Sequence, residues 1–166
     1  MIYNIKDFGA VGDGKTLNTK SIQKAIDECT KNGGGQVLVD GGVYLTGGIE
    51  IKDNVDFHIT AGTVLLGSPN VEDFPERQNV KHVVTEMLPR WRNASIIFAD
   101  EAKNITLSGM GTIDSNGLSF VKLKEKYLGG WKYERIDAPT PPRVVFFTGC
   151  QNVKIIDVTM INQPSG

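Results

Sequence analysis

Three times along the chain, an asparagine stands immediately before a short segment in which apolar and polar residues alternate. These asparagines are Asn54, Asn104 and Asn152, so the repeats lie 50 and 48 residues apart. Such alternation is typical of β-strands, and asparagine tolerates the left-handed backbone of a tight corner. Its amide can also bond to an asparagine in the next layer of a stack. The repeat therefore favours a β-solenoid, and chance asparagine turns in a β-sandwich are the alternative.

The solenoid interpretation predicts many short strands. Solenoid repeats take roughly 20 to 30 residues, so each interval between asparagines is expected to hold about two coils. No second helical pattern separates the strands, which argues against a doubly wound α/β sheet. The expected strands span residues 36–39, 48–51, 55–59, 63–66, 95–99, 105–108, 112–114, 144–147, 153–156 and 158–161.

One amphipathic helix is expected before the strands. Apolar residues recur at the i, i+3, i+4, i+7 spacing from Ile22 to Cys29. Asn18 or Thr19 can cap its start, and the glycines at 33–35 end it because glycine reaches the left-handed conformation without a Cβ clash. In a solenoid, such a helix covers the open face of the first coil.

Composition restricts the function classes. The 166 residues suit one domain, and a net charge of −1 argues against a nucleic-acid partner. No apolar run approaches the length of a membrane span, and the N-terminus lacks a signal-peptide core. Cys29 and Cys150 are expected to be buried free thiols, with a disulfide as the alternative.

Several motifs are spread along nearly the whole chain, at 7–14, 33–37, 42–47, 104–114 and 142–162. Together they resemble the polygalacturonase-like, pectin-degrading glycoside hydrolases. The resemblance implies an all-β fold, a single-stranded right-handed parallel β-helix (a pectin-lyase-like solenoid) with a short N-terminal capping α-helix. It also implies one domain over 1–166, with a cap over about 1–35 followed by the first coils, stopping before the catalytic coils.

The same resemblance implies inverting acid/base hydrolysis of polygalacturonan or rhamnogalacturonan, which needs two carboxyl groups across the scissile bond. The family places them in Asn-Thr-Asp, Asp-Asp, Gly-His-Gly and Arg-x-Lys motifs, and none of these occurs in this sequence. No catalytic residue, metal ligand or cofactor is therefore assigned, and the chain alone is expected to be inactive. The alternatives are a polysaccharide lyase or epimerase, and a non-catalytic carbohydrate-binding or structural β-helix.

Two polar segments, 69–92 and 118–142, interrupt the strand pattern and are expected to be long loops. The first contains Arg90, Trp91 and Arg92, and Arg143 follows the second. Arginine binds carboxylates through a bidentate fork, and an aromatic ring can stack on a sugar face. These four residues are the candidate substrate contacts. The alternative is a loop anchored by a buried tryptophan with solvated arginines.

The expected partner is an acidic plant cell-wall polysaccharide, with no nucleic acid and no membrane. If the coils stop near residue 161, the last coil leaves apolar side chains and backbone groups unpaired, and self-association through this end is expected. The resemblance implies export, to the cell exterior or the periplasm.

Overall fold

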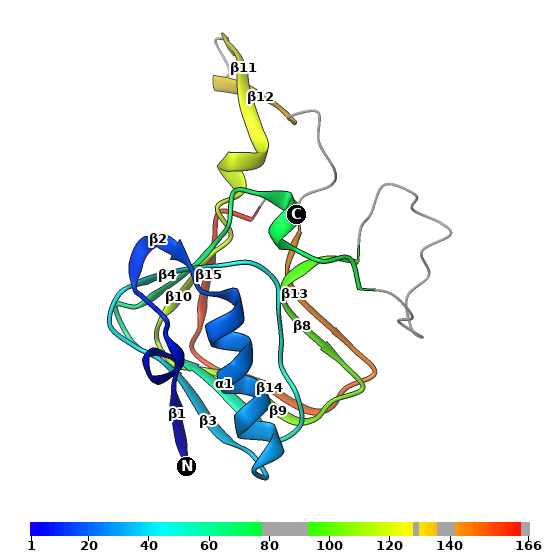
Figure 1. Cartoon of the computed structure of the whole chain (residues 1–166). Helices are drawn as coiled ribbons and strands as arrows, with labels where there is room; N and C mark the ends of the chain where they lie inside the picture. The colour runs from blue at the N-terminus through cyan, green and yellow to red at the C-terminus, as the bar shows by residue number, and fades with distance from the viewer. Residues whose placement is uncertain (78–92, 128–129, 136–141, 164–166) are drawn as a thin grey trace.

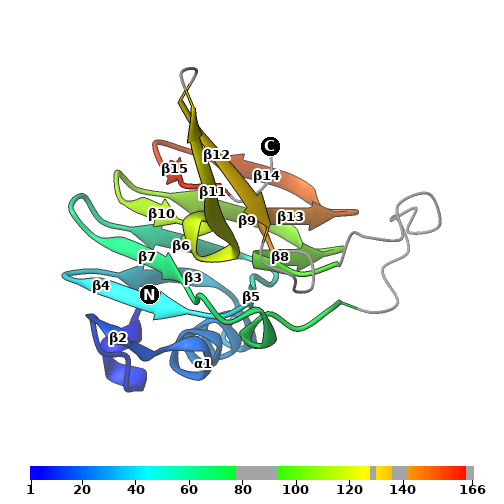
Figure 2. The same cartoon turned by 90° about the horizontal axis from the view of Figure 1, so that it is seen from above.

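The computed structural model describes residues 1–77, 93–127, 130–135 and 142–163. The chain forms a right-handed parallel β-helix, in which successive coils stack along one axis (Figures 1 and 2). Equivalent strands of the coils make up three parallel sheets, here called A, B and C. The predicted fold class is therefore confirmed. Sheet A contains β1 (Ile2–Asn4), β3 (Gly35–Val39), β6 (Val55–Ile59), β9 (Lys103–Ser108) and β14 (Gln151–Ile155). Sheet B contains β2 (Asp13–Leu17), β4 (Val43–Thr46), β7 (Val64–Gly67), β10 (Thr112–Asp114) and β15 (Thr159–Ile161). Sheet C contains β5 (Ile49–Glu50), β8 (Ser95–Asp100) and β13 (Arg143–Thr148).

The three repeated asparagines occupy equivalent corners of neighbouring coils. Asn54, Asn104 and Asn152 all have left-handed backbones, with φ of 62°, 55° and 56°. Asn104 Nδ2 donates to Asn54 Oδ1 at 3.0 Å, and Asn152 Nδ2 donates to Asn104 Oδ1 at 2.9 Å. The solenoid interpretation of the repeat is confirmed.

The expectation of two coils per interval is wrong. Strand β6 pairs directly with β9, and β9 pairs directly with β14, so each interval of about 50 residues is one coil. The first complete coil is much shorter, because Gln36 pairs with Asp56 only 20 residues on. The later coils are longer because each carries a long segment between sheets B and C.

All ten predicted strands are present, with bounds that agree within two residues, and β1, β2 and β4 were not predicted. The expectation of a loop throughout 118–142 is wrong. Strands β11 (Val121–Tyr127) and β12 (Gly130–Arg135) form an antiparallel hairpin that projects from the body (Figure 1).

The short 3-10 helices are η1 (Ile5–Phe8), η2 (Val71–Asp73) and η3 (Gly117–Phe120).

The helix α1 (Thr19–Lys31) lies at one end of the stack and packs on β1, β3, β5 and β6 (Figure 2). Its face from Ile22 to Cys29 is buried, and Gly33 and Gly34 follow it with φ of 93° and 103°. Both the capping role and the glycine stop are as predicted. Within the described part of the chain, no helix is long and apolar enough to cross a membrane.

The side chain of Asn18 does not cap α1, although Asn18 occupies the N-cap position. Its Oδ1 accepts from Val11 N at 2.8 Å, and its Nδ2 donates to Val11 O and Thr16 O. Thr19 Oγ1 accepts from Gly47 N at 2.7 Å. The predicted capping chemistry is wrong because the Asn18 side chain instead bonds to the residues just before α1 and to Leu45 O, and Thr19 bonds to Gly47.

Inward-facing side chains stack in rows along the axis. In one row, Phe57 pairs with Leu107 and Leu107 pairs with Ile155. Phe57 and Leu107 are fully buried, whereas Ile155, in the last coil, is 49% exposed. The core therefore runs from α1 through the middle coils and is open at the end that carries β13, β14 and β15.

Candidate functional site

The outer face of sheet C carries a row of side chains from three successive coils. Glu50 pairs with Phe98, and Phe98 pairs with Phe146. The neighbouring row, from Ile49 through Ile97 to Val145, packs in the core, so the first row faces outward. The Phe98 and Phe146 ring centroids lie 5.7 Å apart, with an angle of 36° between the ring planes.

Both long segments leave the solenoid at the same corner, where the chain passes from sheet B to sheet C. Only Gly47 and Gly48 join β4 to β5, whereas residues 68–94 join β7 to β8 and residues 115–142 join β10 to β13. Loops on a rigid scaffold are common positions for binding groups. Residues of both long segments are therefore brought close to the outward aromatic row at the beginning of the sheet C strands.

The first long segment begins with a strap, defined here as residues 68–77, that packs against the corner of the preceding coil. Phe74 is fully buried in the core, and Gly48 N donates to Asp73 O at 3.0 Å. Ser68 Oγ also donates to Asp73 Oδ2 at 2.5 Å. This part of the predicted loop is therefore held against the solenoid, and it places Arg77 next to sheet C.

Arg77 lies over the aromatic row. Its Cζ is 4.9 Å from the centroid of the Phe98 ring, and its Nη1 is 3.9 Å from Glu50 Oε2. Burial lowers the pKa of the Arg77 guanidinium, and the Glu50 carboxylate opposes that shift. Sequence reasoning missed Arg77, because nothing in a proline-bearing polar segment indicates which arginine returns to the sheet.

Arg143, a predicted candidate, lies one coil further along the same face. It begins β13, and its N donates to Ala94 O at 2.9 Å. Its Cζ lies 4.5 Å from the centroid of the Phe146 ring, and burial lowers the pKa of its guanidinium. The structure therefore pairs each outward phenylalanine of sheet C with one arginine (Phe98 with Arg77, Phe146 with Arg143).

The other three candidates, Arg90, Trp91 and Arg92, lie outside the described residues. We call Arg77, Phe98, Arg143 and Phe146 the arginine–aromatic row. Near it, the buried atoms Arg77 Nε and Asn93 Oδ1 have no hydrogen-bond partner. Arg77 N donates to Asn93 O at 2.8 Å, which brings the two residues together. Unsatisfied buried polar groups are unusual in native proteins and are often satisfied by water or a ligand.

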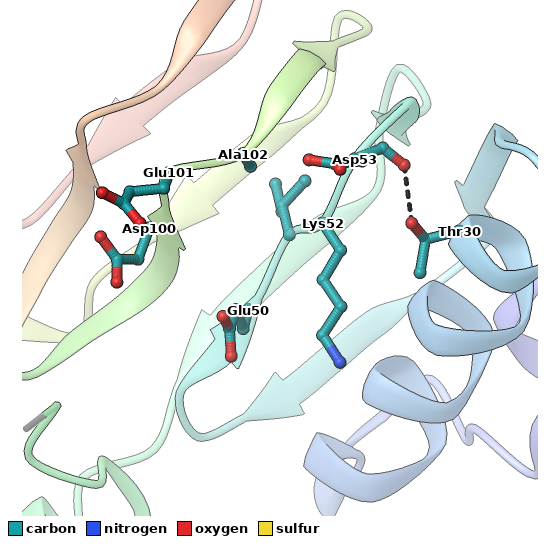
Figure 3. Close-up of a pocket in the computed structure, with 8 residues that line it drawn as sticks. Thr30, Glu50, Lys52, Asp53, Asp100, Glu101 and Ala102 are labelled. Atoms are coloured by element: carbon teal, nitrogen blue, oxygen red, sulfur yellow. Dashed lines mark hydrogen bonds between the residues drawn. The ribbon is translucent and has the colours of Figure 1, made fainter.

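A pocket of about 320 Å³ opens at the other end of the sheet C strands, next to the last turn of α1 (Figure 3). Carboxylates outnumber cations in its lining, and Glu50 links it to the arginine–aromatic row. Thr30 Oγ1 donates to Asp53 O at 2.8 Å across its rim (Figure 3). The lining residues are Thr30, Glu50, Ile51, Lys52, Asp53, Asp100, Glu101 and Ala102.

Part of this acidic lining is engaged in structural bonds. Asp53 Oδ1 accepts from Lys103 N at 2.8 Å, and Lys52 Nζ lies 2.7 Å from Asp27 Oδ1. Asp100 Oδ1 is buried without a hydrogen-bond partner. Among the residues the structure describes, no group of three or more potential ligands is arranged to hold a metal ion.

His58 and the cysteines lie away from this face. His58 is half-buried on the outer side of β6, with Nδ1 2.8 Å from Ser108 Oγ, and Ser108 donates to Asp56 Oδ1 at 2.6 Å. This bridge joins two neighbouring coils. Both cysteines are free, and Cys29 is buried as predicted. The expected burial of Cys150 is wrong, because it lies in the open last coil and is only half-buried.

Taken together, the fold and this face define a right-handed parallel β-helix protein whose third sheet displays arginines stacked on aromatic rings. The chain belongs to the rhamnogalacturonase A/epimerase, pectate lyase-like family, which matches residues 2–138.

Individual relatives agree with the polygalacturonase-like resemblance. The chain is 38% identical over 124 residues to an exo-poly-α-D-galacturonosidase of Dickeya chrysanthemi, covering 70% of this chain and 20% of the relative. It is 30% identical over 176 aligned positions to a probable polygalacturonase of Vitis vinifera, covering 98% of this chain and 32% of the relative. The structure of a Yersinia enterocolitica family 28 exopolygalacturonase superposes with a TM-score of 0.74 at 25% identity, covering 99% of this chain and 35% of that one. The chain thus spans between a fifth and about a third of these proteins.

Proposed function

We propose that this chain is the N-terminal part of a longer glycoside hydrolase that cleaves pectic polysaccharide, polygalacturonan or rhamnogalacturonan, by inverting acid/base hydrolysis. In this proposal the chain supplies the cap, the first coils and one rim of the sugar-binding cleft. The observation that carries it is the less covered end of the outward row of sheet C, where Arg143 lies over the half-buried Phe146.

This arrangement suits a sugar that bears carboxylates. A guanidinium binds a carboxylate through a bidentate fork. Burial of Arg143, which lowers its pKa, also removes competing water and strengthens such a contact. Aromatic rings can pack against the C–H face of a sugar. Uronic acid units combine both features, and plant cell-wall pectin is rich in them.

Catalytic carboxylates are proposed to lie in further coils stacked on β13, β14 and β15. Inverting hydrolysis needs two carboxyl groups roughly 6.5 to 9.5 Å apart, so that a water molecule fits between the base and the sugar. On the described face, Glu50 is paired with Arg77. Two observations support further coils. The relatives are several times longer than this chain, and Val153 and Ile155 are 40% and 49% exposed in rows that are otherwise buried.

A second candidate function is a polysaccharide lyase or epimerase acting on acidic chains. The matched family includes epimerase and pectate lyase-like members by description, and the acidic pocket beside Glu50 offers carboxylates at one end of the same face. Proton abstraction beside a uronate carboxylate is chemistry that such an enzyme must perform.

The test is product analysis with the full-length polypeptide that carries this chain, on polygalacturonate and on rhamnogalacturonan. A hydrolase releases reducing ends on saturated sugars, because water adds across the glycosidic bond. A lyase releases unsaturated products that absorb in the ultraviolet, and an epimerase changes sugar configuration without cleaving the chain. Unsaturated products or epimerised chains would overturn the hydrolase proposal, and binding without any product would support a non-catalytic β-helix.

A further inference from the structure

The outer face of sheet C is covered at the end nearest α1. Phe98 is only 4% exposed although its ring points outward, whereas Phe146, one coil further on, is half-buried. Arg77 covers Phe98 by lying 4.9 Å from its ring centroid, and the 3.9 Å contact with Glu50 ties the guanidinium to the adjacent coil. Arg77 therefore occupies the space above two strands of this face, β5 and β8.

The strap holds Arg77 there through fixed contacts. Phe74 anchors it in the core, and Arg77 N donates to Asn93 O at 2.8 Å. The strap crosses the preceding coil at Gly48, between β4 and β5. A Cβ at this position would lie 2.9 Å from Ser95 O and 3.2 Å from Pro75 Cδ. A side chain at position 48 would press on the backbone of β8 at Ser95 and on the strap at Pro75. The close approach thus depends on glycine at this corner.

Glu50, which contacts Arg77, also lines the acidic pocket next to α1. The pocket at the far ends of β5 and β8 carries the carboxylates of Glu50, Asp53, Asp100 and Glu101 and the single cation of Lys52. Lys52 is already paired with Asp27. A polysaccharide extending along the axis toward α1 would meet Arg77 as a steric block.

We propose that Arg77 and the strap close the cap end of the polysaccharide-binding face, so that a bound acidic polysaccharide places a chain end over Phe146 and Arg143. This inference rests on the proposed function and adds its mode of attack. Neighbouring strands are about 4.8 Å apart. When β5 and β8 are covered, two strands of the face are closed to a polysaccharide that runs along the axis. A chain that cannot pass Arg77 is cut near its terminus, and short products leave while most of the polymer keeps its length.

Product size and viscosity, measured together on the full-length polypeptide with polygalacturonate, test this closure. The wild-type protein should release short products from the start, with little loss of viscosity for each bond cleaved. Arg77→Ala removes the block, and Gly48→Ser disturbs the packing of the strap on β5 and β8 while keeping the Arg77 side chain. Each variant should shift early products toward longer oligomers and increase the viscosity loss per bond several-fold.

Controls separate this effect from general damage. Lys154→Ala alters an exposed residue on sheet A and should leave the product pattern unchanged. Circular dichroism and melting temperature show whether a variant is folded, and Gly48→Ser decides the question if Arg77→Ala is not. Long oligomers from the wild-type protein, or folded variants with a wild-type product pattern, would overturn the inference.

Binding provides a readout that does not depend on catalysis. Oligogalacturonides of increasing length should stop gaining affinity at a shorter length for the wild-type protein than for Arg77→Ala. Identical length dependence in the two proteins would contradict the closure. A polypeptide that binds with this length difference but releases no sugar would contradict the proposed hydrolase and leave the closure supported.

Discussion

The side-chain amide of Asn104 donates a hydrogen bond to the side-chain oxygen of Asn54 at 3.0 Å, across 50 residues of sequence. The Oδ1 of Asn104 in turn accepts from Asn152 at 2.9 Å. Asn104 is therefore the middle member of a ladder that fixes the register of three coils. Its φ of 55° adds a second requirement, because few residues other than glycine adopt this backbone readily.

Substituting Asn104 separates these two contributions. Asn104→Ala loses both ladder bonds and places a Cβ in the left-handed region, so the free energy of unfolding should fall by about 2 kcal/mol. Asn104→Gly loses the same bonds but keeps the backbone conformation accessible, and should cost about 1 kcal/mol. Urea unfolding of the two variants measures the difference. Equal losses would show that backbone strain contributes nothing at this corner.

The asparagine repeat and the strand pattern could be predicted because both depend on local sequence. Alternation marks each strand, and the left-handed corner selects asparagine, so Asn54, Asn104 and Asn152 were visible without any structure. The number of coils could not be predicted in the same way. Coil length depends on whether a segment between two strands pairs within the stack or leaves it, and residues 68–94 and 115–142 leave it.

The candidate site was predictable only in part. Arg143 could be identified because it follows the second polar segment and arginine suits a carboxylate, and the structure places it over Phe146. Arg77 could not, because its position depends on Phe74 reaching the core and on a close approach at Gly48. These contacts join segments about 25 residues apart in sequence, and no periodicity in the sequence records them.

The row from Phe57 to Ile155 predicts a contrast between two substitutions. Leu107 is fully buried between coils, so Leu107→Ala should lower the free energy of unfolding by about 2–5 kcal/mol through lost burial and a cavity. Ile155 is 49% exposed in the last coil, so Ile155→Ala should cost less than about 1 kcal/mol in this chain. Guanidinium unfolding of the 166-residue chain provides both values.

The same Ile155→Ala substitution reports on what covers the open end. If a further coil or a second copy of the chain packs there, Ile155 becomes buried, and the cost should approach that of Leu107→Ala. Repeating the measurement in the full-length polypeptide, and at several protein concentrations for the isolated chain, distinguishes these cases. A cost that stays small under all conditions would show that this end is not covered.

Asp13 predicts a component of acid sensitivity. Backbone hydrogen bonds from Thr16 and Lys15, and the Thr16 hydroxyl, lower the pKa of the Asp13 carboxyl from 3.8 to about 2. Because the folded-state pKa lies below the unfolded value, this carboxylate stabilises the fold fully above pH 3.8. That stabilisation is lost as the pH falls toward about 2.

Asp13→Asn should remove this component while keeping an oxygen that can accept from the same backbone amides. Melting temperatures measured between pH 2 and pH 6 should therefore fall less steeply on acidification for the variant than for the wild-type chain. Glu72→Gln is a suitable control, because Glu72 is an exposed carboxylate on the strap rather than in β2. Parallel curves for wild type and Asp13→Asn would show that the Asp13 turn does not contribute to acid sensitivity.

Arg143 predicts how the outward face distinguishes acidic from neutral sugars. Arg143→Ala removes a charged donor worth about 1.5–3 kcal/mol when it bonds to a carboxylate, so affinity for an oligogalacturonide should fall about tenfold or more. Arg143→Lys keeps the charge but loses the bidentate fork and the planar contact with Phe146. Its affinity should lie between those of the wild-type protein and Arg143→Ala.

Calorimetric titration of the full-length polypeptide gives these affinities, with melting temperatures to check folding. A neutral oligosaccharide of the same length provides the matched comparison, since its weaker binding should be the same in all three proteins. If Arg143→Ala binds the acidic and neutral sugars as the wild type does, Arg143 only packs on Phe146 and does not contact substrate.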